Sequence, residues 1–159
     1  MNTRQPAIHL LLLALAAVAP VRWATAQEEF SSFASVQDDG SLRVAGNRVH
    51  LYGIYIPPTG QSCYTFVRPV ACGSRAALAL DFKISGDFVH CLPRATNPDG
   101  SITASCSAGN QDLSAWMLQQ GWAVARPDAP FEYAALERIA QSKGIGIWGI
   151  PVERIPRKP

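Results

Sequence analysis

The chain has 159 residues, of which 14 are lysine or arginine and 12 are acidic, so its formal net charge is +2. Hydrophobic residues make up 48% of it, which is enough for a globular domain with a core of its own. The small charge excess disfavours nucleic acid as a partner, because nucleic-acid-binding proteins neutralise phosphates with many basic residues.

The first 26 residues have the layout of a secretory signal peptide. A basic start is followed by an apolar run over residues 7–19, and Ala24-Thr25-Ala26 is typical of a cleavage site. The apolar run is shorter than the roughly 20 residues of a membrane-spanning helix, which favours cleavage over a retained membrane anchor. We therefore expect a periplasmic or secreted bacterial protein that begins at Gln27 and has no transmembrane segment.

Removal of the signal peptide leaves 12 basic and 12 acidic residues, because that segment carries two arginines and no acidic residue. The remaining chain reads as one domain over residues 27–150. A proline-rich basic tail over residues 151–159 is typical of a solvated chain end. We expect an unknown envelope protein or an oligomeric ligand as partner, with nucleic acid less favoured by the balanced charge.

The domain begins with three predicted strands in a meander. The runs 33–37, 42–46 and 47–56 are separated by turns that contain Gly40 and Gly46. In the third run apolar residues alternate with polar ones until Gly53, where a glycine is typical of a bulge beside a functional site. The following residues, 58–70, are predicted to form a loop.

The four cysteines all follow the signal peptide and predict two disulfides. A metal site is the competing interpretation, but the sequence has no Cys-x-x-Cys pair. The turn sequence Asn-Pro-Asp-Gly lies midway between Cys91 and Cys106, which places them opposite each other in a hairpin. We therefore expect the pairs Cys91–Cys106 and Cys63–Cys72, each stabilising the fold by roughly 3 kcal/mol in the chain-entropy model.

Three segments have the spacing of helices. Residues 72–84 place Ala76, Leu80 and Ile84 on one face, with the hairpin strands 87–95 and 101–109 after them.

A second helix is predicted to start at the cap Asp112 and to stop at Gly121. The third, residues 130–144, is expected to turn Leu136, Ile139 and Ala140 inward. Five strands and three helices predict a mixed α+β protein, mainly a small, partly open β barrel of the OB type.

Four motifs follow one another in a specific order within residues 33–148, namely SLRVAGNRVHLYGI, CGSRA, DLSAWMLQQGWAVA and GIW. Their order resembles the staphylococcal-nuclease-like, or thermonuclease, family, in particular its exported cysteine-bearing bacterial branch. The resemblance implies a five-stranded OB-fold barrel with three helices. It also implies calcium-dependent hydrolysis of DNA or RNA, with carboxylates on the calcium ion, a glutamate that activates water and two arginines on the phosphate.

All the positions that match the family's catalytic residues are substituted here. Gly40 and Tyr55 stand where the calcium-binding aspartates are implied, His50 and Ser101 where the arginines are, and Pro58 where the glutamate is. A proline side chain can neither accept a proton nor hold a metal, and a protonated tyrosine is a poor calcium ligand. We therefore expect a pseudoenzyme without metal or other cofactor, which serves as a binding or scaffold module in the cell envelope.

Two other interpretations remain open. The first is a weak or altered nuclease that depends on a divalent metal such as calcium. In it one face would carry a rebuilt acid–base site made of Asp38, Asp39, His50, Tyr55 and Asp99. Arg48 would share a strand face with His50, two residues away. The second is a structural subunit of an envelope assembly, whose interface is the face that carries the tyrosines and prolines.

Aromatic residues near the same face are candidates for binding. OB barrels stack oligonucleotides or oligosaccharides on the face formed by their second and third strands. Tyr55, Tyr64 and His50 are therefore predicted to contact a ligand. The alternative is that Tyr52 and Tyr55 only fill the space that a charged site has left.

Overall fold

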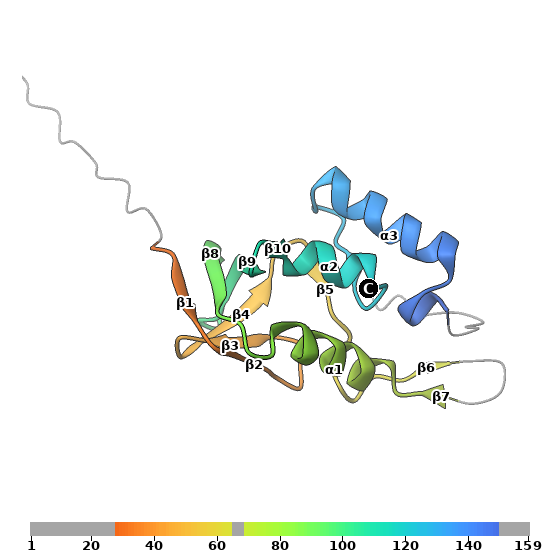
Figure 1. Cartoon of the computed structure of the whole chain (residues 1–159), viewed down its shortest axis with the longest axis horizontal. Helices are drawn as coiled ribbons and strands as arrows, with labels where there is room; N and C mark the ends of the chain where they lie inside the picture. Colours follow the sequence, from red (N-terminus) through yellow and green to blue (C-terminus); the bar gives the residue numbers. More distant parts are fainter. Residues whose placement is uncertain (1–27, 65–68, 150–159) are drawn as a thin grey trace, which may run out of the picture.

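The structure is a computed structural model that describes residues 28–64 and 69–149 (Figure 1). The predicted signal peptide and the basic tail lie outside these residues. Within the described ranges, no helix is both long enough and apolar enough to cross a membrane.

Short strands form one mixed sheet that curls into a nearly closed barrel, with the order β1-β8-β9-β4-β3-β2 and β10 added to β9. The strands are β1 (Phe30–Ser32), β2 (Ala34–Val36), β3 (Leu42–Val44), β4 (Asn47–Leu51), β8 (Val89–Thr96), β9 (Ile102–Ala108) and β10 (Gln111–Asp112). β1 pairs with β8 and β2 pairs with β3. Because Phe33 alone joins β1 to β2, the chain itself connects the two edges of the sheet.

The predicted meander and hairpin are both present. β2, β3 and β4 pair antiparallel in chain order, and Leu42, Val44 and Val49 are fully buried between them and the rest of the core. β9 runs parallel to β4, with Ile102 opposite Val49. This parallel pairing places the β8–β9 hairpin beside the meander and so brings two distant parts of the sequence together.

The chain leaves the barrel at Gly53, so the expectation of a bulge within one long strand is wrong. β4 ends at Leu51, and β5 (Ile54–Tyr55) pairs with β11 (Val124–Ala125) in a separate two-stranded sheet. Gly53 adopts the left-handed conformation, with φ 74°, which turns the chain between the two sheets.

The segment predicted as a loop before the first helix also differs from the expectation. It contains a short ribbon of β6 (Cys63–Tyr64) and β7 (Pro69–Val70). Residues 65–68, between these two strands, lie outside the described residues.

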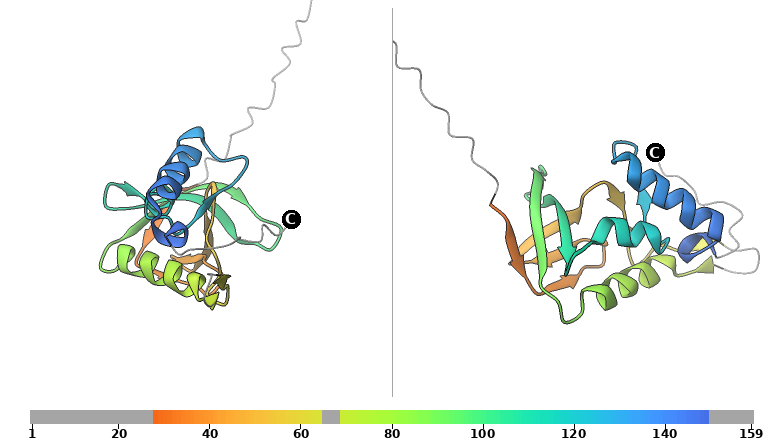
Figure 2. Two further views of the ribbon diagram at one scale, coloured as in Figure 1. Left: turned by 90° about the vertical axis from the view of Figure 1, so that its right-hand side faces the viewer. Right: turned by 45° about the horizontal axis from the view of Figure 1, so that its top comes forward.

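Three helices lie at one side of the barrel (Figure 1): α1 (Cys72–Ile84), α2 (Leu113–Gln119) and α3 (Phe131–Lys143), followed by the 3-10 turn η1 (Gly146–Trp148). Figures 1 and 2 show α2 between α1 and α3. α1 has the predicted bounds, and its residues Ala76, Leu80 and Ile84 are buried. α2 has the predicted cap, because the Asp112 carboxylate accepts a hydrogen bond from the Ala115 backbone N–H at 2.8 Å.

The inward face of α3 contains Leu136 and Ala140, as predicted, but not Ile139. Ile139 is 48% exposed, whereas Tyr133 is 7% exposed and Ala140 is fully buried. Tyr133, Leu136 and Ala140 follow the spacing of one helix face, from which Ile139 points away by one residue, or about 100°. The Tyr133 hydroxyl is accommodated at this face because it donates to Asp112 Oδ2 at 2.8 Å.

Both predicted disulfides are present. The Cα–Cα distance is 5.6 Å in Cys63–Cys72 and 4.1 Å in Cys91–Cys106. Cys91 and Cys106 are partners in the register of β8 and β9, as the hairpin prediction required. Two disulfides in one small domain indicate an oxidising, extracytoplasmic environment.

Candidate functional site

An open groove of about 750 Å³ lies where β4 ends, and we call it the β4 groove. Its walls come from four parts of the chain: the β2–β3 turn, the segment 50–56, the β8–β9 hairpin and the segment before α3. The residues predicted for a site that line it are Asp39, Gly40, His50, Tyr55, Asp99 and Ser101. The barrel therefore brings together positions up to about 60 residues apart in the sequence.

Other predicted positions lie elsewhere. Pro58 is outside the groove, and its carbonyl accepts a hydrogen bond from the Gln61 backbone N–H at 2.8 Å. Asp38 and Arg48 line a neighbouring depression of about 330 Å³ together with Arg43. The side chain of Tyr64 lies outside the described residues, so its predicted contact with a ligand stays a prediction.

Two turns of identical sequence flank β4. Residues 39–41 and residues 99–101 both read Asp-Gly-Ser, and their glycines have φ 79° and 80°. In each turn the aspartate Oδ1 accepts the serine backbone N–H at 3.0 Å and the serine hydroxyl at 2.6 Å. The strand residues that follow, Leu42 and Ile102, both pair with Val49, so the turns sit on opposite sides of one strand.

The aspartates of these turns are held ionised by their surroundings. Partial burial raises the pKa of Asp39, but hydrogen bonds from Ser41 and Arg48 outweigh that effect and lower the pKa to about 2. The Arg48 guanidinium donates to Asp39 Oδ2 and forms an ion pair with it. Hydrogen bonds from Ser101 lower the pKa of Asp99, and the charge of Arg48 adds to this effect.

These side chains do not fit a calcium site of the kind that the family resemblance implies. Calcium takes six to eight oxygen ligands. Gly40 has no side chain, the Tyr55 hydroxyl donates to Gln61 Oε1 at 3.0 Å, and Asp39 is engaged by Ser41 and Arg48. Among the described residues, no three His, Cys, Asp or Glu side chains are placed to hold a metal ion.

Several residues of the groove have no local signal in the sequence. The Arg94 guanidinium lies over the Tyr52 ring, 5.5 Å from its centroid, and its Nε donates to Ser105 Oγ at 3.0 Å. Arg126 and Asp128 also line the groove, and Arg126 Nε lies 3.7 Å from Asp128 Oδ1. They reach the groove because β11 pairs with β5, which no pattern within either segment predicts.

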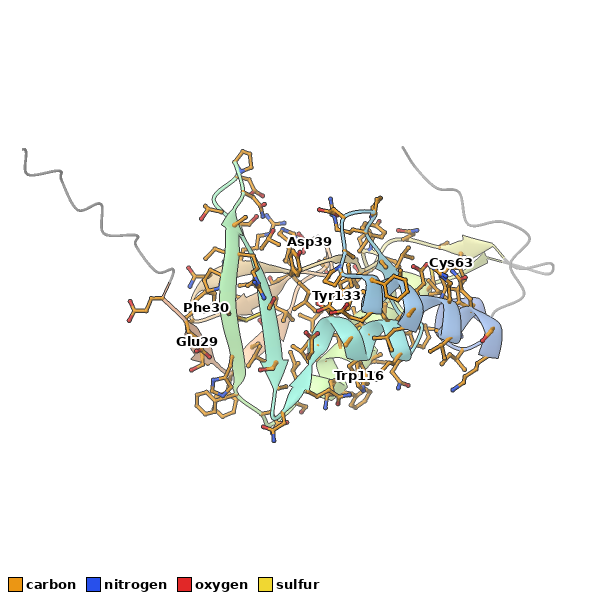
Figure 3. All side chains as sticks on the ribbon, turned by 90° about the horizontal axis from the view of Figure 1, so that it is seen from above. Glu29, Phe30, Asp39, Cys63, Trp116 and Tyr133 are labelled. Carbon is orange, nitrogen blue, oxygen red and sulfur yellow. A yellow bond between two sulfur atoms is a disulfide. The ribbon has the colours of Figure 1, made fainter. Side chains whose placement is uncertain are left out.

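Residues of α2 and α3 contact the backbone of Tyr52 and Gly53, which line the groove. Ser114 of α2 donates to the Tyr52 carbonyl at 2.9 Å, and the Arg126 backbone N–H donates to the Gly53 carbonyl at 3.0 Å. The Tyr133 ring of α3 lies against Gly53, where an added Cβ would be 3.0 Å from it. Burial and the bond to Asp112 raise the pKa of Tyr133, so its hydroxyl stays a donor. In Figure 3, Tyr133 lies among the helices and Asp39 among the strands of the barrel.

No protein-family model matches the chain, so the likeness to thermonucleases rests on the motifs alone. A characterised relative is 31% identical over 157 residues, and the match covers 91% of this chain and 82% of the relative. That relative is the succinoglycan biosynthesis protein ExoI of Rhizobium meliloti (strain 1021). At this identity and coverage, the chain belongs to the same family as ExoI.

Proposed function

We propose that the protein is an exported binding or scaffold module of the cell envelope that takes part in the biosynthesis of a polysaccharide. Its barrel is of the thermonuclease-like OB type, and its phosphodiesterase activity is lost. The name of its relative, a succinoglycan biosynthesis protein, supports the process. The two disulfides support the compartment.

The state of Asp39 is the observation that carries the loss of activity. Beside Gly40, it is the carboxylate best placed to replace the missing calcium ligand. Its Oδ1 accepts two hydrogen bonds from Ser41, and its Oδ2 is paired with Arg48. A metal ion at this carboxylate would have to compete with the Arg48 guanidinium for Oδ2. The mixed sheet, with a hairpin beside a meander and helices at one side, supports the OB assignment.

A nuclease assay tests this proposal. The oxidised chain, residues 27–159, is incubated with single-stranded DNA and with RNA, first in calcium and then in magnesium. Circular dichroism shows that the protein is folded, and EDTA provides the control. We expect no cleavage in either metal. Cleavage that EDTA abolishes and that Asp39→Ala removes would contradict the proposal.

A weak metal-dependent nuclease is the second candidate. It is favoured by the meeting of Asp39, Asp99 and His50 in one groove. This candidate predicts cleavage that is lost in both Asp39→Ala and His50→Ala, with calcium or magnesium as the cofactor.

A scaffold without a groove ligand instead predicts that the protein co-purifies with an envelope protein and that groove substitutions leave this association unchanged.

A further inference from the structure

We propose that the β4 groove binds a segment of a glycan chain and that a sugar ring stacks on Tyr55. This inference rests on the proposed function, in which the domain is a binding module rather than a nuclease. It names the ligand class and the residue that the ligand contacts.

The charged side chains that line the groove are of both signs: Asp39, Asp99 and Asp128 are acidic, and Arg94 and Arg126 are basic. Asp39 forms an ion pair with Arg48, which lines the neighbouring depression. Asp128 Oδ1 lies 3.7 Å from Arg126 Nε. Arg94 and Asp99, on the same hairpin, again have opposite charges. A polyanion such as nucleic acid gains its affinity from an excess of cations along its path. The groove therefore suits a polar chain without a dense row of negative charges.

Tyr55 offers this chain an apolar surface. It is 46% exposed and lines the groove, yet it lies on β5, opposite Val124 of β11. Its hydroxyl is fixed by Gln61 Oε1 at 3.0 Å. A ring that is held from both the backbone and the hydroxyl loses little conformational freedom when a ligand packs on it. The C–H face of a sugar ring is a flat apolar surface of comparable size.

Groups around Tyr55 complement the hydroxyls of a sugar, each of which both donates and accepts. Arg94 uses Nε for Ser105 and is held over Tyr52, and its terminal N–H groups remain as donors. Asp99 accepts both bonds from Ser101 at Oδ1, which leaves Oδ2 as an acceptor. The groove volume of about 750 Å³ lies within the range of about 300–1,000 Å³ that ligand sites occupy.

Affinity electrophoresis of the oxidised chain, residues 27–159, tests the proposal. Native gels contain succinoglycan, a neutral β-glucan or single-stranded DNA. We expect retardation by at least one of the two glycans and an apparent affinity about tenfold lower for Tyr55→Ala, as for other aromatic anchors. Tyr55→Phe should keep most of the retardation. Phe82→Ala is the matched control, because Phe82 is 73% exposed on α1, outside the groove.

Three outcomes would overturn the glycan proposal. They are retardation by neither glycan, equal retardation of Tyr55→Ala and the unchanged protein, and retardation by DNA alone that weakens steeply with salt. The first two leave the proposed function standing if the nuclease assay shows no cleavage. Metal-dependent cleavage of DNA would instead contradict the proposed function itself, so the two failures are distinguishable.

Discussion

Asp39 and Asp99 occupy the same position in two turns of the same sequence, and each accepts two hydrogen bonds from the serine two residues later. An aspartate that bonds to the backbone in this way stabilises a tight turn. The buried serines, 0% and 3% exposed, fix the start of the next strand. The carboxylates beside the groove thus have a structural role that needs no metal or substrate.

We predict that Asp39→Asn lowers the free energy of unfolding at pH 7 by about 1 kcal/mol, because the amide keeps the turn but loses the ion pair. The Asp39 side chain is 34% exposed and that of Arg48 53%, so solvent screening limits the effect. The folded pKa of about 2 is below the ordinary value of 3.8. The contribution is therefore present above pH 3.8 and is lost as the pH falls toward 2.

Urea denaturation at several pH values measures this difference. The two proteins should differ at pH 7 and converge near pH 2. Asp38→Asn is the matched control, since among the described residues the Asp38 carboxylate has only a 3.5 Å contact with the Thr59 hydroxyl. A difference between wild type and Asp39→Asn that is constant over the whole pH range would show that the charge of Asp39 does not contribute.

At the scale of elements, the groove depends on where α3 meets the turn between β4 and β5. The Tyr133 ring packs on Gly53, and its hydroxyl reaches the Asp112 cap of α2. One side chain therefore links two helices to the groove. The pairing of β5 with β11 completes this link, because it brings both Tyr55 and Arg126 to the groove.

We predict that Gly53→Ala destabilises the protein by about 2 kcal/mol. Part of this cost is the φ of 74°, which an alanine adopts with strain, and part is the contact of the new Cβ with the Tyr133 ring at 3.0 Å. Gly46→Ala isolates the first part, because Gly46 has φ 82° and nothing within 4 Å of the added Cβ. Denaturation curves of both variants give the comparison. Equal losses would mean that the contact with Tyr133 is unimportant.

The sequence predicts elements well where the signal is local. The bounds of α1 follow from the spacing of its buried residues, and the start of α2 follows from the Asp112 cap. The inward face of α3 follows in part, because Leu136 packs against the core and Ala140 is buried, whereas Ile139 is exposed. The burial of Tyr133 was not predicted, and its hydroxyl donates to Asp112, 21 residues earlier.

At the scale of the whole molecule, the candidate site was predicted in part. The family resemblance placed five positions at one site. Gly40, His50, Tyr55 and Ser101 line one groove, whereas Pro58 lies outside it. Arg94 and Arg126 were not predicted, because they arrive through strand pairings between distant segments. The repeated Asp-Gly-Ser is a signal in the sequence for two similar turns. Their positions on opposite sides of β4 also depend on the parallel pairing of β4 with β9, which the repeat does not predict.

The last prediction concerns export of the protein and formation of its two disulfides. When the full chain is produced in a bacterium, the protein outside the cytoplasm should begin at Gln27, because the predicted cleavage follows Ala26. Its mass should also be lower by two hydrogens for each disulfide. Ala26→Phe places a large residue at the cleavage site and should leave the precursor uncleaved. Mass spectrometry of the wild-type and Ala26→Phe proteins measures where each chain begins and whether its cysteines are oxidised. A wild-type protein that keeps residues 1–26 or four free thiols would contradict the prediction and remove the main support for a role in the envelope.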